Sequence, residues 1–179
     1  MSLHATIRAE RPTDVAAIAA ITREAFRFLS QSSHTEHFII DELRRSKVLS
    51  ISLVAEVNAQ SVGHIAFSPV RIGDGSQDWY GLGPMAVKPE FQGQGIGHAL
   101  VHDGLEALRK LGAQGCVVLG EPEFYGRFGF RNNSGLELEG ARQEFFLSIG
   151  FGQKLAQGRV TYHHAFTAQQ DAKSPPGED

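Results

Sequence analysis

The most informative segment of the chain is Gln92-Gly93-Gln94-Gly95-Ile96-Gly97. Its three glycines alternate with other residues, so the backbone can turn sharply and approach a ligand without a Cβ in the way. Apolar residues follow at helical spacing, which places the segment at the start of a helix. The unpaired N–H groups and the positive dipole end of a helix N-terminus favour anions. The segment therefore predicts a glycine-rich loop that binds a phosphate or a pyrophosphate.

Several kinds of glycine-rich loop could explain this segment. A Walker loop needs Gly-Lys followed by Ser or Thr, and no lysine stands at its end. A dinucleotide fingerprint counted from Gly93 and Gly95 needs a third glycine at position 98, where the chain has His98. The acyl-CoA pattern Gln/Arg-x-x-Gly-x-Gly/Ala is matched by Gln92, Gly95 and Gly97. A purely structural tight turn is the remaining alternative, although three glycines exceed what such a turn needs.

The residues before the loop alternate with a period of two. Apolar side chains recur at every second position over residues 51–57, and a second run covers residues 62–72 after a polar turn. This pattern predicts an antiparallel hairpin. A third strand is predicted over residues 79–87, with Gly83-Pro84 inside it. Because proline cannot donate to a strand ladder, we expect a bulge or the loss of a neighbouring strand there.

Helical spacing identifies the other main elements. A helix is predicted after the N-cap candidates Thr13 and Asp14, and a second one over residues 36–45. The helix that follows the glycine loop is predicted to run to residue 111. The wholly apolar run at residues 116–119 then predicts a strand buried on both faces, as in a parallel pair. Strand, loop, helix and strand together form a βαβ unit.

Further strand candidates at residues 6–9, 145–151 and 159–163 complete an α+β domain with a mixed sheet. We predict one domain over residues 1–167 and a flexible polar tail over residues 168–179, where Pro and Gly are frequent. The domain is large enough for a normal hydrophobic core.

Three linked motifs resemble the GNAT N-acetyltransferase superfamily, and the resemblance covers residues 6–166. They are Met85-Ala86-Val87-Lys88-Pro89, the loop at residues 92–97, and Phe124-Tyr125-Gly126-Arg127-Phe128-Gly129-Phe130. The resemblance implies a central mixed, mostly antiparallel sheet with a splayed parallel strand pair, flanked by helices. It also implies that acetyl-CoA is the co-substrate, with no metal.

The resemblance implies where the cofactor contacts lie. Pantetheine would lie along the strand end and pyrophosphate on the loop. The residues implied are Met85, Ala86, Val87, Gln92, Gly93, Gln94, Gly95, Ile96 and Gly97. One segment departs from the family. Many members have an Asn before the Phe-Tyr pair, whereas this chain has Gly120-Glu121-Pro122-Glu123, a compressed form that resembles small bacterial members of undefined substrate.

The implied chemistry is direct attack of a neutral primary amine on the thioester in a ternary complex. A backbone N–H near Met85 or Ala86 would polarise the carbonyl. The resemblance makes Tyr125 the acid that protonates the leaving thiolate, whereas spacing alone favours a packed aromatic. Glu121 is a candidate base at the mouth of the splay. His64 is a second one, although a buried, hydrogen-bonded histidine is the more common fate; water could relay the proton instead.

Histidine and cysteine positions predict no metal site. His98 and His102 lie four residues apart, but Ala99 follows His98, so the H-E-x-x-H pattern is absent. We expect these to be surface histidines. Cys116 is the only cysteine, so no intrachain disulfide can form, and we expect a small buried hydrophobe.

The composition argues against nucleic acids and membranes as partners. The formal net charge is −3, and no basic stripe of the kind that binds nucleic acid is present. No apolar run approaches the ~20 residues that span a bilayer, and no signal peptide is recognisable. We therefore expect a cytoplasmic protein. The resemblance implies that the acceptor is a small-molecule or protein amine, selected by residues 27–47 and the C-terminal strands, and that a homodimer would form at those strands.

Two other functions stay open at this point. One is a non-catalytic module that binds acyl-CoA and senses its concentration. The other is a nucleotide-binding protein that uses the same loop, which the failed Walker and dinucleotide patterns disfavour.

Overall fold

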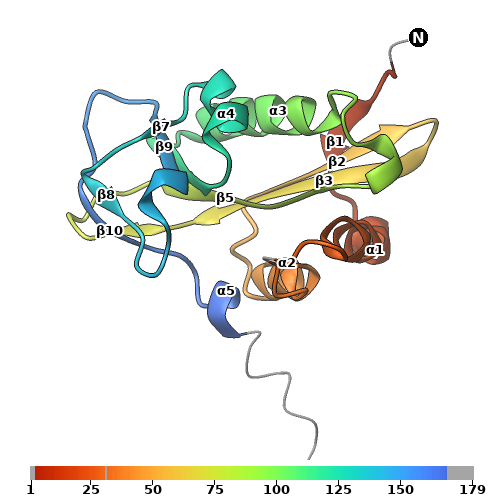
Figure 1. Cartoon of the computed structure of the whole chain (residues 1–179), viewed down its shortest axis with the longest axis horizontal. Coiled ribbons are helices and arrows are strands. Elements are labelled where there is room, and N and C mark those ends of the chain that lie inside the picture. Colours follow the sequence, from red (N-terminus) through yellow and green to blue (C-terminus); the bar gives the residue numbers. More distant parts are fainter. Residues whose placement is uncertain (1–2, 31, 169–179) are drawn as a thin grey trace, which may run out of the picture.

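The computed structural model describes residues 3–30 and 32–168. A central sheet lies between two helical layers (Figure 1). One layer holds α1 (Val15–Phe26), α2 (Glu36–Arg45) and the short α5 (Ala165–Ala168), and the other holds α3 (Ile96–Leu111) and the short α4 (Pro122–Tyr125). The predicted boundary at residue 167 stays a prediction, because residues 169–179 of the predicted tail lie outside the described residues.

Within the described ranges, the central sheet has seven strands in the order β1-β2-β3-β5-β6-β9-β7. Neighbouring strands are antiparallel except for β5 and β6. The mixed, mostly antiparallel sheet of the predicted α+β fold is therefore confirmed. The strands are β1 (Thr6–Ala9), β2 (Ile51–Val57), β3 (Gln60–Pro69), β5 (Trp79–Val87), β6 (Gly115–Leu119), β9 (Phe146–Gly150) and β7 (Arg131–Asn132).

The parallel pair β5 and β6 is joined only at its beginning. Trp79, Tyr80 and Gly81 pair with residues 115–117 of β6, and the later residues of β5 have no partner there. The predicted bulge lies just beyond this point. Leu82 faces Phe67 and Met85 faces Ile65 on β3, so the pair Gly83-Pro84 stands opposite a single residue. The bulge bends β5 away from β6, and a V-shaped gap opens between the two strands.

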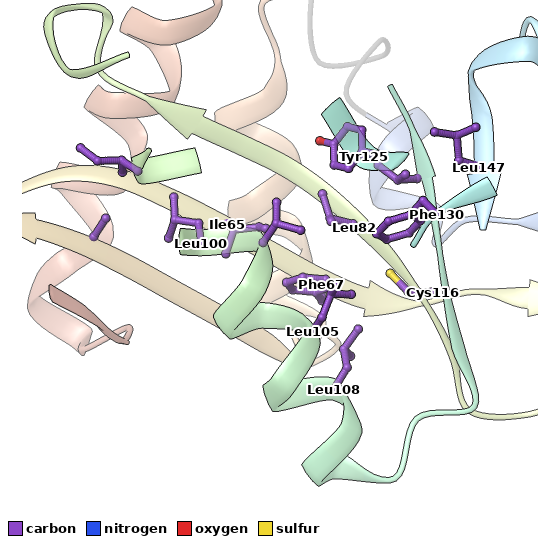
Figure 2. Packing of buried hydrophobic residues seen from close by; sticks show 14 of the residues in the cluster. Ile65, Phe67, Leu82, Leu100, Leu105, Leu108, Cys116, Tyr125, Phe130 and Leu147 are labelled. Carbon is purple, nitrogen blue, oxygen red and sulfur yellow. The ribbon is translucent and has the colours of Figure 1, made fainter. Parts of the chain in front are cut away.

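The main core lies between α3 and the sheet. Figure 2 shows Leu100, Leu105 and Leu108 of α3 beside Ile65 and Phe67 of β3, all of them buried. Apolar residues at positions three and four apart give α3 this buried face. Replacing one such leucine by alanine costs about 2–5 kcal/mol of folding free energy. The core thus fixes α3, and with it the glycine loop that precedes it.

The C-terminal part differs from the single sheet expected from the sequence. The predicted strand over residues 62–72 breaks at Val70, so that β4 (Arg71–Ile72) leaves the central sheet. It joins β10 (Gly158–Thr161) and β8 (Leu136–Glu137) in a small second sheet of order β4-β10-β8. The two predicted closing strands therefore belong to different sheets. Their separation leaves room for a cavity beside the V-shaped gap.

An ion-pair network fixes the start of the chain. The guanidinium of Arg8 on β1 donates to both carboxylate oxygens of Asp14, at 2.7 and 2.9 Å, and to Glu56 on β2 at 2.5 Å. The backbone N–H of Arg11 also donates to Asp14, at 2.6 Å. The hydrogen bonds from Arg8 are the main reason that the pKa of Asp14 falls to about 2. The network ties β1, the 3-10 turn Pro12–Asp14 and β2 together.

Replacing Asp14 by asparagine should lower the free energy of unfolding at pH 7 by about 1–3 kcal/mol, because the half-buried Arg8 loses one of its two charged partners and keeps only Glu56. The folded-state pKa of Asp14 lies below its ordinary value. Its stabilising effect is therefore complete above about pH 4 and is lost as the pH falls through about 2. Urea denaturation at several pH values measures both effects.

The control is Asp103→Asn, since Asp103 is half exposed on α3. That variant should unfold like the wild type. A difference between wild type and Asp14→Asn that stays constant down to pH 2 would contradict the assigned ion pair.

Candidate active site

The glycine loop has the backbone conformation that its sequence predicts. Gly93 and Gly95 have φ values of +73° and +85°, which side-chain-bearing residues rarely adopt. A Cβ at either position would meet no atom within 4 Å. Backbone conformation, and not lack of space, therefore requires glycine here, and the loop surface is open to a ligand.

Two exposed glutamine side chains hydrogen-bond to the backbone that precedes the loop. The amide of Gln92 donates to the carbonyl of Val87 at 2.9 Å, and that of Gln94 donates to the carbonyl of Glu90 at 3.1 Å. The first hydrogen bond of α3 runs from the N–H of Ala99 to the carbonyl of Gly95. The N–H groups of residues 96–98 precede that bond and lie outside the helical ladder. They form a pre-arranged anion site.

A cavity of about 580 Å³ lies between this loop, the end of β5 and α1; we call it the loop cavity. Seven of the nine predicted cofactor residues line it: Met85, Ala86, Val87, Gln92, Gly93, Gly95 and Gly97. The other two do not. The Gln94 side chain holds the loop to Glu90, and the Ile96 side chain is buried in the core. Ile96 can contribute only its backbone N–H.

Several residues that line the loop cavity were missed in the sequence. His98, expected as an ordinary surface histidine, is exposed at the cavity and stacks on Phe128 with ring centroids 4.6 Å apart. Arg127 lies beside it, and no ion pair engages Arg127 among the residues described. Both residues could have been identified as candidates from their positions in the sequence. His98 is in the first turn after the loop, and Arg127 is inside the aromatic motif. The remaining missed residues are Ala25, Phe26, Leu29, Phe91 and Phe124.

A second cavity of about 980 Å³ borders the bulge, next to the loop cavity; we call it the bulge cavity. Leu82, Gly83 and Pro84 line the bulge cavity, whereas the next three residues of β5 line the loop cavity. Phe26 and Leu29 border both. A molecule in one cavity can therefore meet a molecule in the other beside β5. This arrangement suits a transfer between two substrates bound at the same time.

Tyr125 lies at the end of α4 and is buried among aromatic rings. Its ring centroid is 4.9 Å from that of Phe124 and 5.7 Å from that of Phe130. In Figure 2 its hydroxyl points away from Phe130 and Leu147. Burial is the main cause that raises the pKa of Tyr125 to about 12, so the phenol is protonated at neutral pH. Tyr125 is not among the residues that line either cavity, although its neighbour Phe124 lines the loop cavity.

The two base candidates from the sequence lie in different settings. Glu121 is exposed at the start of α4 and lines neither cavity, and its role stays a prediction. His64 is fully buried on β3 and also lines neither. Its Nε2 is 2.7 Å from the Ser52 hydroxyl, while Nδ1 has no hydrogen-bond partner. Burial lowers the pKa of His64 to about 4, so its imidazole is neutral at pH 7. The expectation of a buried histidine is correct, but its hydrogen bonding is incomplete.

Tyr162 is a further, half-buried phenol that sequence patterns did not identify. It follows β10, lines the bulge cavity and stacks on Phe166 with centroids 5.0 Å apart. A Cβ on Gly81, the last residue of β5 paired to β6, would lie 2.4 Å from this ring. The ring therefore covers the closed end of the V-shaped gap. The pairing of β10 with β4 and β8 brings the ring there, and those pairings are not visible in the sequence.

Two searches of the described residues gave negative results. No group of three or more His, Cys, Asp or Glu residues in those ranges is arranged to hold a metal ion. None of the helices within residues 3–30 and 32–168 is long and apolar enough to cross a bilayer.

The Tyr125 ring depends on the absence of a side chain at Gly120. A Cβ there would lie 2.4 Å from Cε2 of Tyr125, well inside van der Waals contact. Gly120→Ala should therefore displace the ring and lower the free energy of unfolding by about 1–3 kcal/mol. Urea denaturation measures the change. Gly150→Ala is the matched control, because a Cβ at Gly150 meets no atom within 4 Å; equal stability of the two variants would refute the contact.

Comparisons with known proteins agree with this architecture. Residues 49–132 match the GNAT acetyltransferase domain family. The chain is 38% identical over 125 residues to a protein named uncharacterized N-acetyltransferase YhbS from Escherichia coli K12. The matched region covers 69% of this chain and 72% of that protein. A GNAT family acetyltransferase from Brucella melitensis, solved in complex with acetyl-CoA, is 47% identical with a TM-score of 0.81, covering 91% of this chain and 98% of that one. E. coli YhbS in complex with CoA is 32% identical with a TM-score of 0.84, covering 93% and 94%. The chain therefore belongs to the GNAT family of N-acetyltransferases.

Proposed function

We propose that this protein transfers the acetyl group of acetyl-CoA to a primary amine by direct attack in a ternary complex. The observation that carries the proposal is that two cavities lie next to each other at the bulge of β5. One lies beside the glycine loop, whose N–H groups suit a phosphate, and the other has room for a second substrate. The Brucella relative was solved with acetyl-CoA and YhbS with CoA, which supports the choice of co-substrate.

The loop cavity offers groups of the right kind for each part of acetyl-CoA. The N–H groups of residues 96–98 suit the pyrophosphate, and His98 and Arg127 are donors beside them. The end of β5 has no partner strand on the β6 side, so its backbone is free to bond pantetheine amides. Pantetheine that follows residues 87 to 85 would carry the thioester to the bulge.

The reaction forms a C–N bond and breaks the C–S bond of the thioester. A backbone N–H of Met85 or Ala86 is proposed to polarise the carbonyl. The leaving thiolate needs a proton, and we assign it to Tyr125. Full transfer from a phenol of pKa about 12 to a thiolate of ordinary pKa costs about 5 kcal/mol, and a thiol buried beside it narrows that gap. The amine loses its proton to Glu121 or to water.

The first test concerns the loop. Gly95→Glu places a carboxylate and a side chain at the start of α3, where both oppose phosphate binding. Isothermal titration with acetyl-CoA should show binding to the wild type and at least a hundredfold weaker binding to this variant. Gly75→Glu is the control, because Gly75 has a similar φ of +81° and the same open space, but lies in a turn outside both cavities. An equal loss of affinity for acetyl-CoA in both variants would show that the substitutions act by disturbing the fold, and it would refute the loop assignment.

The second test concerns Tyr125. Tyr125→Phe should lower kcat by about a hundredfold, since positioned proton donors contribute at least that much, and should leave the affinity for acetyl-CoA unchanged. Release of coenzyme A, followed with a thiol reagent, measures kcat. Tyr80→Phe is the matched control, because Tyr80 is a half-buried phenol on the part of β5 that is paired with β6, before the bulge. An unaltered kcat in Tyr125→Phe would remove Tyr125 from the mechanism.

The alternative is a non-catalytic sensor that binds acetyl-CoA and transfers nothing. Binding of acetyl-CoA without release of coenzyme A in the presence of any amine would favour it. The large bulge cavity supports the enzyme, since a sensor of acetyl-CoA alone has no need of a second site. We place the protein in the cytoplasm, in keeping with its single buried cysteine and its proposed use of acetyl-CoA.

A further inference from the structure

The bulge cavity has few charged groups for its size. Its only Lys or Arg among the described residues is Arg159, whose guanidinium lies 3.2 Å from the carboxylate of Glu139. Both side chains are more than half exposed, so the pair sits at the rim. An acceptor with a carboxylate or a phosphate would have to compete with Glu139 for this one cation. The cavity is therefore poorly suited to amino acids and to phosphorylated amines.

The other carboxylate of the bulge cavity is Glu36, in the first turn of α2. Glu36 is half-buried and accepts a hydrogen bond from the Ser32 hydroxyl. Arg23 and Arg27 border a smaller neighbouring cavity together with Glu36, but neither comes within 4.0 Å of it to form an ion pair. The carboxylate of Glu36 can therefore attract one ammonium group into the cavity. Polyamines would bring further charges that find no such partner.

Hydrocarbon covers most of the remaining wall. Ile39, Leu82 and Val160 are buried residues that border the cavity from α2, β5 and β10. Leu119 at the end of β6 is 52% exposed, and Phe166 stacks on Tyr162. These side chains come from one helical layer, the central sheet and the small second sheet, so the apolar wall borders the cavity from more than one side. An occupant with an apolar body would cover them and release water.

We propose that the acceptor is a monoamine carried on an alkyl or arylalkyl body, without a carboxylate or a phosphate. This inference rests on the proposed function, because it takes the bulge cavity to be the acceptor site. The ammonium group is drawn in by Glu36 and loses its proton to water or to Glu121 before the attack, while the hydrocarbon body lies against the apolar wall. Because the two cavities border consecutive residues of β5 and share Phe26 and Leu29, an amine bound beside the bulge would lie next to the loop cavity.

A homologous series of amines tests the wall directly. Butylamine, pentylamine, hexylamine and octylamine are titrated into the protein saturated with coenzyme A, which cannot react. Each added methylene should lower Kd about fourfold, the equivalent of ~0.8 kcal/mol per buried CH₂. A Kd that does not change with chain length, or tighter binding of spermidine, lysine or glucosamine 6-phosphate than of hexylamine, would overturn the inference.

A variant pair tests the location. Leu119→Gln should reduce the Kd ratio between butylamine and octylamine at least threefold, because it makes part of the wall polar. Leu111→Gln is the control, since Leu111 is 54% exposed on α3 and lines neither cavity; it should leave the ratio unchanged. An identical ratio in Leu119→Gln and the wild type would place the amine elsewhere and refute the inference.

Transfer is measured separately with acetyl-CoA and the same amines. Coenzyme A release whose kcat/KM rises with chain length supports both proposals. Length-dependent binding without any release keeps the inference about the cavity and rejects the proposed transfer. Release with spermidine or lysine in preference to the alkylamines keeps the transferase and rejects the alkylamine acceptor.

Discussion

The separation of β5 from β6 is the constraint on which the rest of the site depends. A parallel pair normally bonds along its length, but here three residue pairs are followed by a bulge that takes β5 away. Leu82 and the residues after it are held on one side by β3 and are open on the other. Both cavities are built against this open edge. If β5 stayed paired with β6 along its whole length, this edge would be hydrogen-bonded and no gap would remain beside the glycine loop.

Neighbouring elements keep the gap from closing. Tyr162 covers the closed end above Gly81, and Tyr125 lies against Gly120 just beyond β6. Each ring occupies the place that a side chain on the glycine would fill. The ring over Gly120 comes from five residues further along the chain, and the ring over Gly81 comes from the distant C-terminal part. The gap is therefore a packed feature with rigid walls, which agrees with its role in positioning reactants.

The sequence predicted the local features of this arrangement well. Period-two and helical patterns located the helices α1 to α3 and the strands around the loop, because those elements bury one face along a regular repeat. The bulge followed from Pro84, which lacks an N–H. The burial of the Ile96 side chain was also predictable, since Ile96 and Leu100 lie four residues apart on the buried face of α3. Ile96 was nevertheless included among the cofactor residues, although only its backbone N–H can reach a cofactor.

The missed features depend on contacts between distant segments. The second sheet consists of strands of two to four residues, too short to show a period, and its pairs join residues 71 and 72 to residues 160 and 161. Tyr162 reaches the gap only through that sheet. Phe26 and Leu29 border the cavities because of the way α1 lies across β5, which no local pattern records.

The sharing of Phe26 and Leu29 between the two cavities has a thermodynamic consequence. An occupant of one cavity that shifts either side chain reshapes the wall of the other, so the two binding equilibria are linked. Linkage is reciprocal: whatever factor the first ligand applies to the affinity of the second, the second applies to the first. The affinity of each molecule in the presence of the other would therefore depend in part on two side chains that take no part in the chemistry.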